Sequence, residues 1–290
     1  MTWGLFFAFM SSVSWGVAPI LQKRAVAGAD GLSMVEMNAA RAAGLIVCLV
    51  PMTFLVPGLG LSTQLYTVLL LLALVNNVVG DVLAFVAIRD IGVSLTSPIT
   101  STYVLMMTAA SWLWFEEALT PFVVLGTVGV VIGIALLTSG KSTGAVKRRA
   151  HGIAAAAAAA VCWAVGLSLG KYLTAAGVDS IVIIYWRCLM FSVAAIAIWG
   201  VERTTGRRSS ASLSSFGAGA AAGVVALVIG GWCYFTSLTL IPMNVATPVS
   251  STSPLIAALI ACLFGSERLR PAQWVGIGLI VAGAAAVNAG

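Results

Sequence analysis

One carboxylate, Asp81, lies past the middle of a long apolar stretch over residues 65–88. Asn77 precedes it by one helical turn, so the two side chains share a face if this stretch is a helix. In lipid a carboxylate is unfavourable by roughly 2.5 to 3.5 kcal/mol and faces a wet cavity or a partner. Asp81 is therefore expected to bind a cationic group or a coupling proton, or to be a structural tether to Arg41 or to a neighbouring serine.

Two tryptophans, Trp15 and Trp163, are each followed eight residues later by a lysine, Lys23 and Lys171. Both lie too deep in apolar stretches for the aromatic belts of a membrane interface, and a buried indole N–H needs an acceptor. We expect the pair to line a central pocket, with core packing as the alternative. Gln22 shares the Trp15 face two turns later.

Prolines and hydroxyl residues occur together near residues 96–102 and 247–252. Proline removes an intrahelical hydrogen bond, and hydroxyls one turn on can bond the freed carbonyl or a substrate. Packing between helices is the alternative for these small residues. Aromatic side chains would stack on an apolar substrate group. The predicted substrate-binding residues are Trp15, Gln22, Asn77, Asp81, Ser97, Ser101, Tyr103, Trp163, Trp232, Thr247 and Ser251.

The elements that must position these residues are membrane-spanning helices. The chain is 60% hydrophobic and 8% charged, whereas soluble domains carry about 25% charged residues. A helix needs about 20 apolar residues to cross the hydrocarbon core. The predicted fold is therefore all-α and integral to the membrane, with ten spans near residues 3–22, 32–56, 65–88, 95–115, 122–138, 152–173, 180–199, 216–238, 245–264 and 273–288.

Basic residues mark one side of the membrane. Twelve of the fifteen lysines and arginines fall in alternate loops, which the positive-inside rule places in the cytoplasm. We therefore expect a cell (inner) membrane protein with both termini on the extracytoplasmic side, and this distribution favours lipid over nucleic acid as the partner. The five cysteines lie within predicted spans without metal-type spacing, so no metal site, disulfide framework or cofactor is expected.

The second half of the chain repeats the first with a spacing of 150 residues. Five helices per repeat is an odd number, so the second repeat must enter the membrane inverted relative to the first. The predicted domains are a first repeat over 1–140, a basic cytoplasmic connector over 141–151 and an inverted second repeat over 152–290. The matched pairs are Pro98/Pro248, Glu117/Glu267, Pro121/Pro271, Gly126/Gly276 and Gly133/Gly283.

The repeated marks resemble a known family. They comprise the two Trp-to-Lys spacings, the matched Arg41 and Arg187, and the Glu-x-Leu-x-Pro-x4-Gly-x6-Gly ending that begins at Glu117. In this order the marks are similar to the tandem EamA repeats of the drug/metabolite transporter superfamily. The resemblance covers nearly the whole chain and implies two inverted five-helix repeats. It also implies a secondary transporter or exporter, with bacterial aromatic amino acid exporters among the similar members.

The two repeats differ at positions that could set selectivity. Asp81 corresponds to Gly231, and Tyr103 corresponds to Ser253 of the Ser-Pro pair in the ninth span. The matched arginines, Arg41 and Arg187, favour a shared scaffold role, and the alternative is that such a basic group senses an anionic carboxylate.

The leading functional expectation is alternating-access export of a small metabolite, such as an amino acid. Proton-coupled efflux of cationic drugs is the alternative within transport, and it would need Asp81 as the proton carrier. An intramembrane enzyme is a third class. Serine hydrolysis needs a base, yet the only histidine, His151, lies in the connector, and an aspartic dyad needs two deep acids where only Asp81 is present.

Overall fold

A computed structural model of the chain describes residues 1–27, 30–56, 61–139, 149–204, 211–263 and 270–289, and the elements over these ranges are helices. The first half contains α1 (Thr2–Val26), α2 (Met34–Met52), α3 (Thr63–Leu72), η1 (Ala73–Gly80), α4 (Asp81–Ile91), α5 (Val93–Ser101), α6 (Tyr103–Phe115) and α7 (Pro121–Thr138). The second half contains α8 (Arg149–Ala175), α9 (Ser180–Thr204), α10 (Leu213–Gly223), η2 (Val224–Gly230), α11 (Gly231–Leu240), α12 (Met243–Ser250), α13 (Ser253–Leu263) and α14 (Pro271–Ala289).

The predicted architecture of ten spans in two inverted repeats is confirmed. Within the described ranges, nine helical runs are long and apolar enough to cross a membrane. The remaining predicted span, over residues 95–115, is divided at Thr102 into α5 and α6. Its counterpart in the second half is divided between Ser250 and Ser253 into α12 and α13.

Local sequence signals define where several helices begin. Ser33 and Glu36 form a reciprocal capping box at the start of α2, in which each side chain accepts from the other residue's backbone N–H. Thr120 accepts from the backbone N–H of Val123 at the start of α7, and Pro121 occupies the first helical turn. Pro121, which recurs as Pro271 in the second repeat, is therefore part of a helix-start signal.

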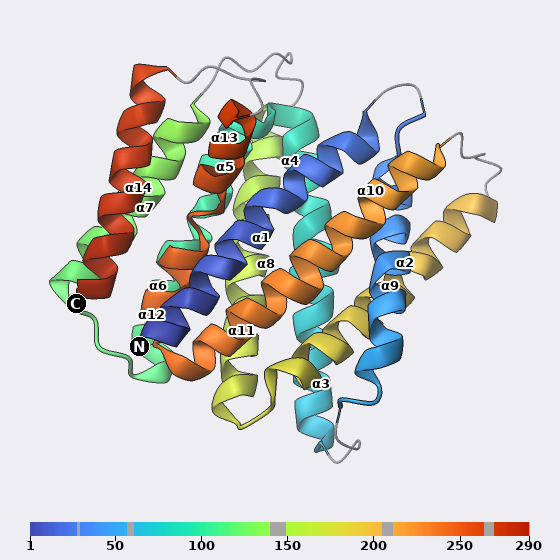
Figure 1. Cartoon of the computed structure of the whole chain (residues 1–290), viewed down its shortest axis with the longest axis horizontal. Helices are drawn as coiled ribbons and strands as arrows, with labels where there is room; N and C mark the ends of the chain where they lie inside the picture. The colour runs from blue at the N-terminus through green and yellow to red at the C-terminus, as the bar shows by residue number, and fades with distance from the viewer. Residues whose placement is uncertain (28–29, 57–60, 140–148, 205–210, 264–269, 290) are drawn as a thin grey trace.

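The two halves exchange their first helices. α1 packs against α10, η2 and α11 of the second half, and α8 packs against α3, η1 and α4 of the first half. In Figure 1, α1 accordingly runs beside the α10 and α11 ribbons. α2 and α9 also pack together, and the largest fully buried side chains, Tyr234, Phe191 and Phe235, lie in the core formed around this interface. Among the described residues, each hydrophobic cluster contains side chains of both halves.

Glycines bring α7 and α14 into close contact at the edge of the molecule (Figure 1). A Cβ atom at Gly126 would lie 2.5 Å from the Gly283 carbonyl oxygen, and one at Gly133 would lie 2.7 Å from that of Gly276. Such spacing leaves no room for a side chain, as in other helix pairs built on small residues. The glycines that mark the repeat, Gly126/Gly276 and Gly133/Gly283, therefore share one packing role at this helix pair.

Two π-helical segments, η1 and η2, interrupt the third and eighth spans at matched positions. A π-helical segment misaligns backbone groups and is frequent at functional sites. η1 contains Asn76 and Asn77, whereas η2 is apolar. Hydropathy gives no signal for such a segment, and sequence analysis did not predict it.

Candidate functional site between the two halves

Each deep tryptophan contacts the π-helical segment of the opposite half. A Cβ atom at Gly230 would lie 2.8 Å from Nε1 of Trp15, and one at Gly80 would lie 2.9 Å from Nε1 of Trp163. The Trp15 indole donates to the Ala226 carbonyl at 3.0 Å. Both indoles therefore lie at the interface between the halves, in a pseudo-symmetric arrangement, and find the acceptors that buried N–H groups require.

Asp81 forms an ion pair with Arg41, with 3.0 Å between Oδ2 and Nη1. The Arg41 side chain is 3% exposed, and the same Nη1 donates to Asn38 Oδ1 at 3.1 Å. The Trp163 indole donates to the other Asp81 oxygen at 3.3 Å. The structure thus contains the tether to Arg41 that was one of the two sequence-based interpretations, and it adds an indole donor from the second half.

The asparagines of η1 differ in their contacts. Asn76 donates to the Trp163 carbonyl at 3.4 Å. Asn77 is buried, and among the described residues its Oδ1 has no hydrogen-bond partner. An unpartnered polar atom in such a place is available to a ligand or to water.

The predicted hydroxyl residues lie at the breaks of the divided spans. Ser101 donates to the Ser97 carbonyl at 2.7 Å where α5 ends, and Ser251 donates to the Pro248 carbonyl at 2.8 Å where α12 ends. Thr247 is fully buried and shares a 2.8 Å hydrogen bond with the Tyr234 hydroxyl. The hydroxyls of Ser101 and Ser251 bond backbone carbonyls at these breaks, but these are not the carbonyls four residues before Pro98 and Pro248 that the prolines free. The role of the hydroxyls toward a substrate stays a prediction.

Two of the aromatic contacts between spans involve the deep tryptophans Trp15 and Trp163. Trp15 lies 5.3 Å from Tyr234 between ring centroids, and Tyr103 lies 6.1 Å from Trp163 in an edge-to-face arrangement. Trp232 is separate from them, since it is 38% exposed and its ring packs edge-on against Phe7. The structure brings three of the four predicted rings, Trp15, Tyr103 and Trp163, to the interface of the halves and leaves Trp232 at its outer surface.

Gln22 is half-buried near the end of α1 and belongs to neither aromatic contact. Lys23, the next residue, is exposed. Its repeat counterpart Lys171 is half-buried in a network at the opposite end of the bundle.

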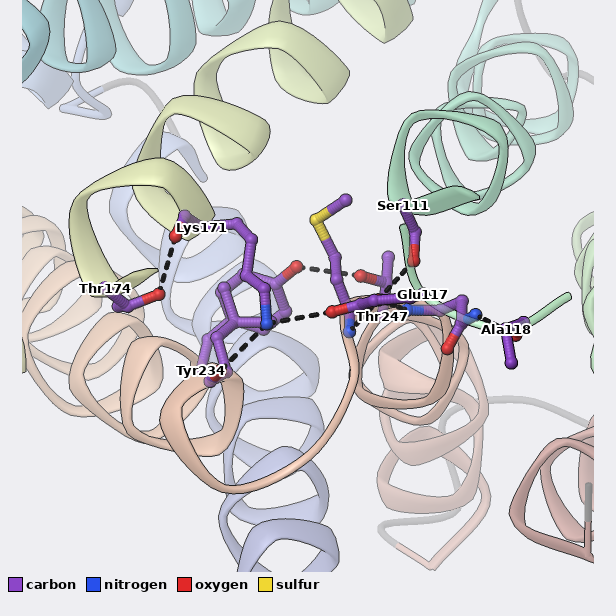
Figure 2. Close-up of polar contacts among 10 residues, drawn as sticks. Ser111, Glu117, Ala118, Lys171, Thr174, Tyr234 and Thr247 are labelled. Atoms are coloured by element: carbon purple, nitrogen blue, oxygen red, sulfur yellow. Dashed lines mark hydrogen bonds and ion pairs between the residues drawn. The ribbon is translucent and has the colours of Figure 1, made fainter. Parts of the chain in front are cut away.

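Figure 2 shows this network around Glu117. The Lys171 ammonium lies 2.9 Å from Glu117 Oε1 and donates to the Leu238 carbonyl at 3.2 Å. Glu117 Oε2 accepts the backbone N–H of Met243 at 2.6 Å and that of Asn244 at 3.2 Å. A carboxylate at the start of α12 satisfies helix N–H groups that lack an intrahelical partner.

Further hydrogen bonds hold the network together. Ser111 donates to Glu117 from the end of α6, and Asn244 Nδ2 donates to the Ala118 carbonyl at 2.8 Å. Four spans are joined at this end, namely those of α6, α8, α11 and α12. We refer to Ser111, Glu117, Lys171, Leu238, Met243 and Asn244 as the Glu117 cluster.

The Glu117 cluster was not among the predicted sites. The sequence does contain the matched pairs Glu117/Glu267 and Lys23/Lys171, but these pairs indicated only the duplication. The signal is incomplete without the fold, because the lysine of one repeat contacts the glutamate of the other. Glu267 and most of the predicted connector over 141–151 lie outside the described residues.

One pocket, of about 140 Å³, lies between α2, α4 and α9. Its lining is apolar except for Asn38, whose side chain accepts from Arg41. A second pocket, of about 290 Å³, lies between the beginnings of α2 and α10 and the end of α9 and contains Trp199 and Arg203. The interfacial tryptophans Trp15 and Trp163 line neither of these two pockets.

Comparison with known proteins supports the same architecture. The model of the EamA-like transporter family matches residues 2–139 and 150–289. A solved structure titled "Crystal structure of protein" is similar over 98% of this chain and 98% of its own, with 17% identity and a TM-score of 0.81, which shows a shared fold. No curated protein sequence matches significantly. Both halves of the chain match the family model, so the protein belongs to the EamA-like transporter family of the drug/metabolite transporter superfamily and is a multi-pass membrane transporter of small molecules.

Proposed function

We propose that the chain exports amino acids, aromatic ones included, or similar small metabolites by alternating access. The observation that carries this proposal is the exchanged packing of the first helices, through which Trp15 contacts η2 and Trp163 contacts η1. Movement of one half relative to the other changes both indole contacts together. Inverted-repeat transporters hold their substrate near the midplane between the repeats, often at discontinuous helices.

The composition of the interface supports an amphipathic substrate. Rings of Trp15, Tyr103, Trp163 and Tyr234 offer flat apolar faces, and such faces also attract cations. The Oδ1 of Asn77, which has no partner in the described part of the chain, offers a hydrogen-bond acceptor on η1. A small molecule with one apolar group and one polar end matches both kinds of surface, which is the chemistry of an amino acid.

The Glu117 cluster supports a gating step. In the orientation favoured by the basic loops, it lies at the extracytoplasmic end, together with both termini. Its ion pair joins α8 of the second half to the loop after α6 in the first half and holds α11 through Leu238. We therefore assign it as the latch that closes this end, and its release opens the route to the exterior. The inner membrane is the proposed location.

Proton-coupled efflux of cationic drugs is less well supported. Asp81 would have to carry the proton, yet its oxygens are occupied by Arg41 and by the Trp163 indole. The same contacts favour the structural tether over a cation-binding role.

Catalysis is not part of the proposal. His151 pairs with Asp90 at 2.6 Å near the far end of α4 from Asp81, and Arg89 pairs with the same carboxylate. This arrangement is a surface contact between α4 and the start of α8. It does not bring the histidine to the deep acid.

A counterflow assay tests the proposed function. Purified protein is reconstituted into vesicles preloaded with an unlabelled amino acid, and uptake of the same labelled amino acid is followed across the twenty standard ones. We expect uptake above protein-free vesicles for at least one of them, with aromatic amino acids among those moved. Uptake equal to that of protein-free vesicles for all twenty would overturn the proposed substrate class.

A further inference from the structure

Arg187 of α9 is a buried cation in the second half of the molecule. It is 3% exposed. Among the residues that the structure describes, its Nη2 donates to the Leu227 carbonyl at 3.0 Å, and its Nε has no hydrogen-bond partner. The guanidinium also lies over the Phe235 ring, 5.3 Å from the centroid. A guanidinium offers five N–H donors, and the one on Nε is unused among the described residues.

The matched arginine of the first half, Arg41, has a carboxylate partner. Arg41 pairs with Asp81 at 3.0 Å, whereas the residue that corresponds to Asp81 in the second half is Gly231. A Cβ atom at Gly231 would lie 2.6 Å from Arg187 Nη2. Position 231 therefore faces the guanidinium directly, and the second half lacks a carboxylate at the place where the first half has Asp81.

The charges at the α2–α9 interface consequently do not balance. Arg41 and Arg187 lie on helices that pack against each other, and Arg41 also lies over Phe191 of α9. Asp81 neutralises one of the two buried guanidinium groups. An unpaired charge inside a membrane protein is unfavourable, and such residues usually mark a substrate or ion pathway.

We propose that Arg187 binds the carboxylate of the transported substrate, which supplies the negative charge that Gly231 does not. The inference rests on the proposed function and narrows its substrate class to amphipathic monocarboxylates. A guanidinium binds a carboxylate through two parallel N–H···O hydrogen bonds. The adjacent rings of Phe235, Tyr234 and Trp15 take the apolar group, since they follow one another with centroids 5.6 and 5.3 Å apart.

The Glu117 cluster connects this site to the gate. Gly231 and Leu238 lie on α11, and Lys171 of α8 holds Leu238 through its carbonyl. Release of Lys171 frees the end of α11 from α8 and allows that helix to move away from Arg187. The buried guanidinium of the present conformation thereby becomes accessible in the open one.

The test uses phenylacetate and its cationic counterpart phenethylamine as probes of the full-length protein in detergent. A ligand that binds the folded state raises the unfolding temperature. The main variant, Gly231→Asp, places a carboxylate against Arg187, and Gly231→Asn places a group of the same size without charge. Arg187→Lys is the second variant, because it keeps the charge and removes the planar fork.

Phenylacetate is expected to raise the unfolding temperature of the unmodified protein, and phenethylamine to raise it less. Gly231→Asp is expected to weaken phenylacetate binding by more than about tenfold relative to Gly231→Asn, because the internal carboxylate occupies the guanidinium. Arg187→Lys is expected to weaken binding as well. Equal phenylacetate binding by Gly231→Asp and Gly231→Asn would overturn the inference, as would an unmodified protein that does not respond to phenylacetate.

Should Gly231→Asp not fold, unchanged phenylacetate binding by Arg187→Lys overturns the inference on its own. The result is separable from that of the counterflow assay. If the protein takes up amino acids but Arg187→Lys leaves phenylacetate binding unchanged, Arg187 is not the binding residue and the proposed function stands. If phenylacetate binds at Arg187 but no amino acid is taken up, the amino acid assignment is wrong and the carboxylate site stands.

Discussion

Lys171 and Glu117 form an ion pair of 2.9 Å between residues of opposite halves. Their side chains are 13% and 11% exposed, so the pair is largely shielded from water and is screened less by salt than a surface pair. The lysine comes from the helix that the second half inserts into the first. The contact therefore exists because the two halves exchange their first helices.

Removing either partner should destabilise this conformation. We expect a double-mutant cycle of Lys171→Met and Glu117→Gln to give a coupling energy of about 1.5 to 3 kcal/mol, the range for hydrogen bonds to charged groups. Thermal unfolding in detergent measures it. The control is Arg89→Gln, which removes an ion pair whose arginine is 59% exposed and should change stability by less than about 1 kcal/mol. A coupling energy near zero would contradict the assigned latch.

The Arg41–Asp81 pair should be structural. Asp81→Asn leaves a buried guanidinium without its counterion, so we expect a loss of roughly 3 to 5 kcal/mol in the free energy of unfolding. Replacing both partners by apolar residues, as in Arg41→Met with Asp81→Leu, should recover most of it. If Asp81→Asn is as stable as the unmodified protein but its transport loses all pH dependence, Asp81 is a proton carrier instead.

The α7–α14 contact should tolerate no side chain at its close-approach glycines. Gly276→Val places a branched side chain against the Gly133 carbonyl and should lower stability by about 1 to 3 kcal/mol through overpacking. Gly278 is two residues away on the same helix, and a Cβ atom there would meet nothing within 4 Å. Gly278→Val is therefore the matched control, and similar unfolding temperatures for both variants would refute the packing role.

Tryptophan fluorescence can check the separation of Trp232 from the interfacial rings. Brominated lipids quench tryptophans that contact acyl chains. Trp232→Phe should reduce the quenched fraction in such vesicles, because this ring is 38% exposed. Trp15→Phe should leave it nearly unchanged, because its indole faces η2. The reverse pattern would place Trp232 with the interfacial rings instead of at the lipid-facing surface.

The number and inversion of the spans could be predicted because they follow from hydropathy and from the distribution of basic residues. The matched Trp15 and Trp163 could also be predicted to meet an interface. What each residue contacts could not, since Trp15 and Gly230 are over 200 residues apart and come together only when the halves exchange helices. Residue type alone did not distinguish Trp232 from Trp163.

The polar interior shows the same limit. Asp81 was identified from its unfavourable burial, and Arg41 was one of its expected partners. The Glu117 cluster was not identified, because Glu117 lies in a loop where a carboxylate is unremarkable by sequence. Glu117 binds the backbone N–H groups at the start of α12. The sequence alone does not show that these groups lie next to it.

The central claim is that transport requires the Lys171 end of the bundle to open. Lys171→Cys and Glu117→Cys are combined in a protein whose five native cysteines are replaced, and counterflow is measured before and after cross-linking with a reducible bifunctional reagent. The account predicts that cross-linking stops counterflow of any amino acid the protein moves and that reduction restores it. Counterflow at an unchanged rate in the fully cross-linked protein would contradict it.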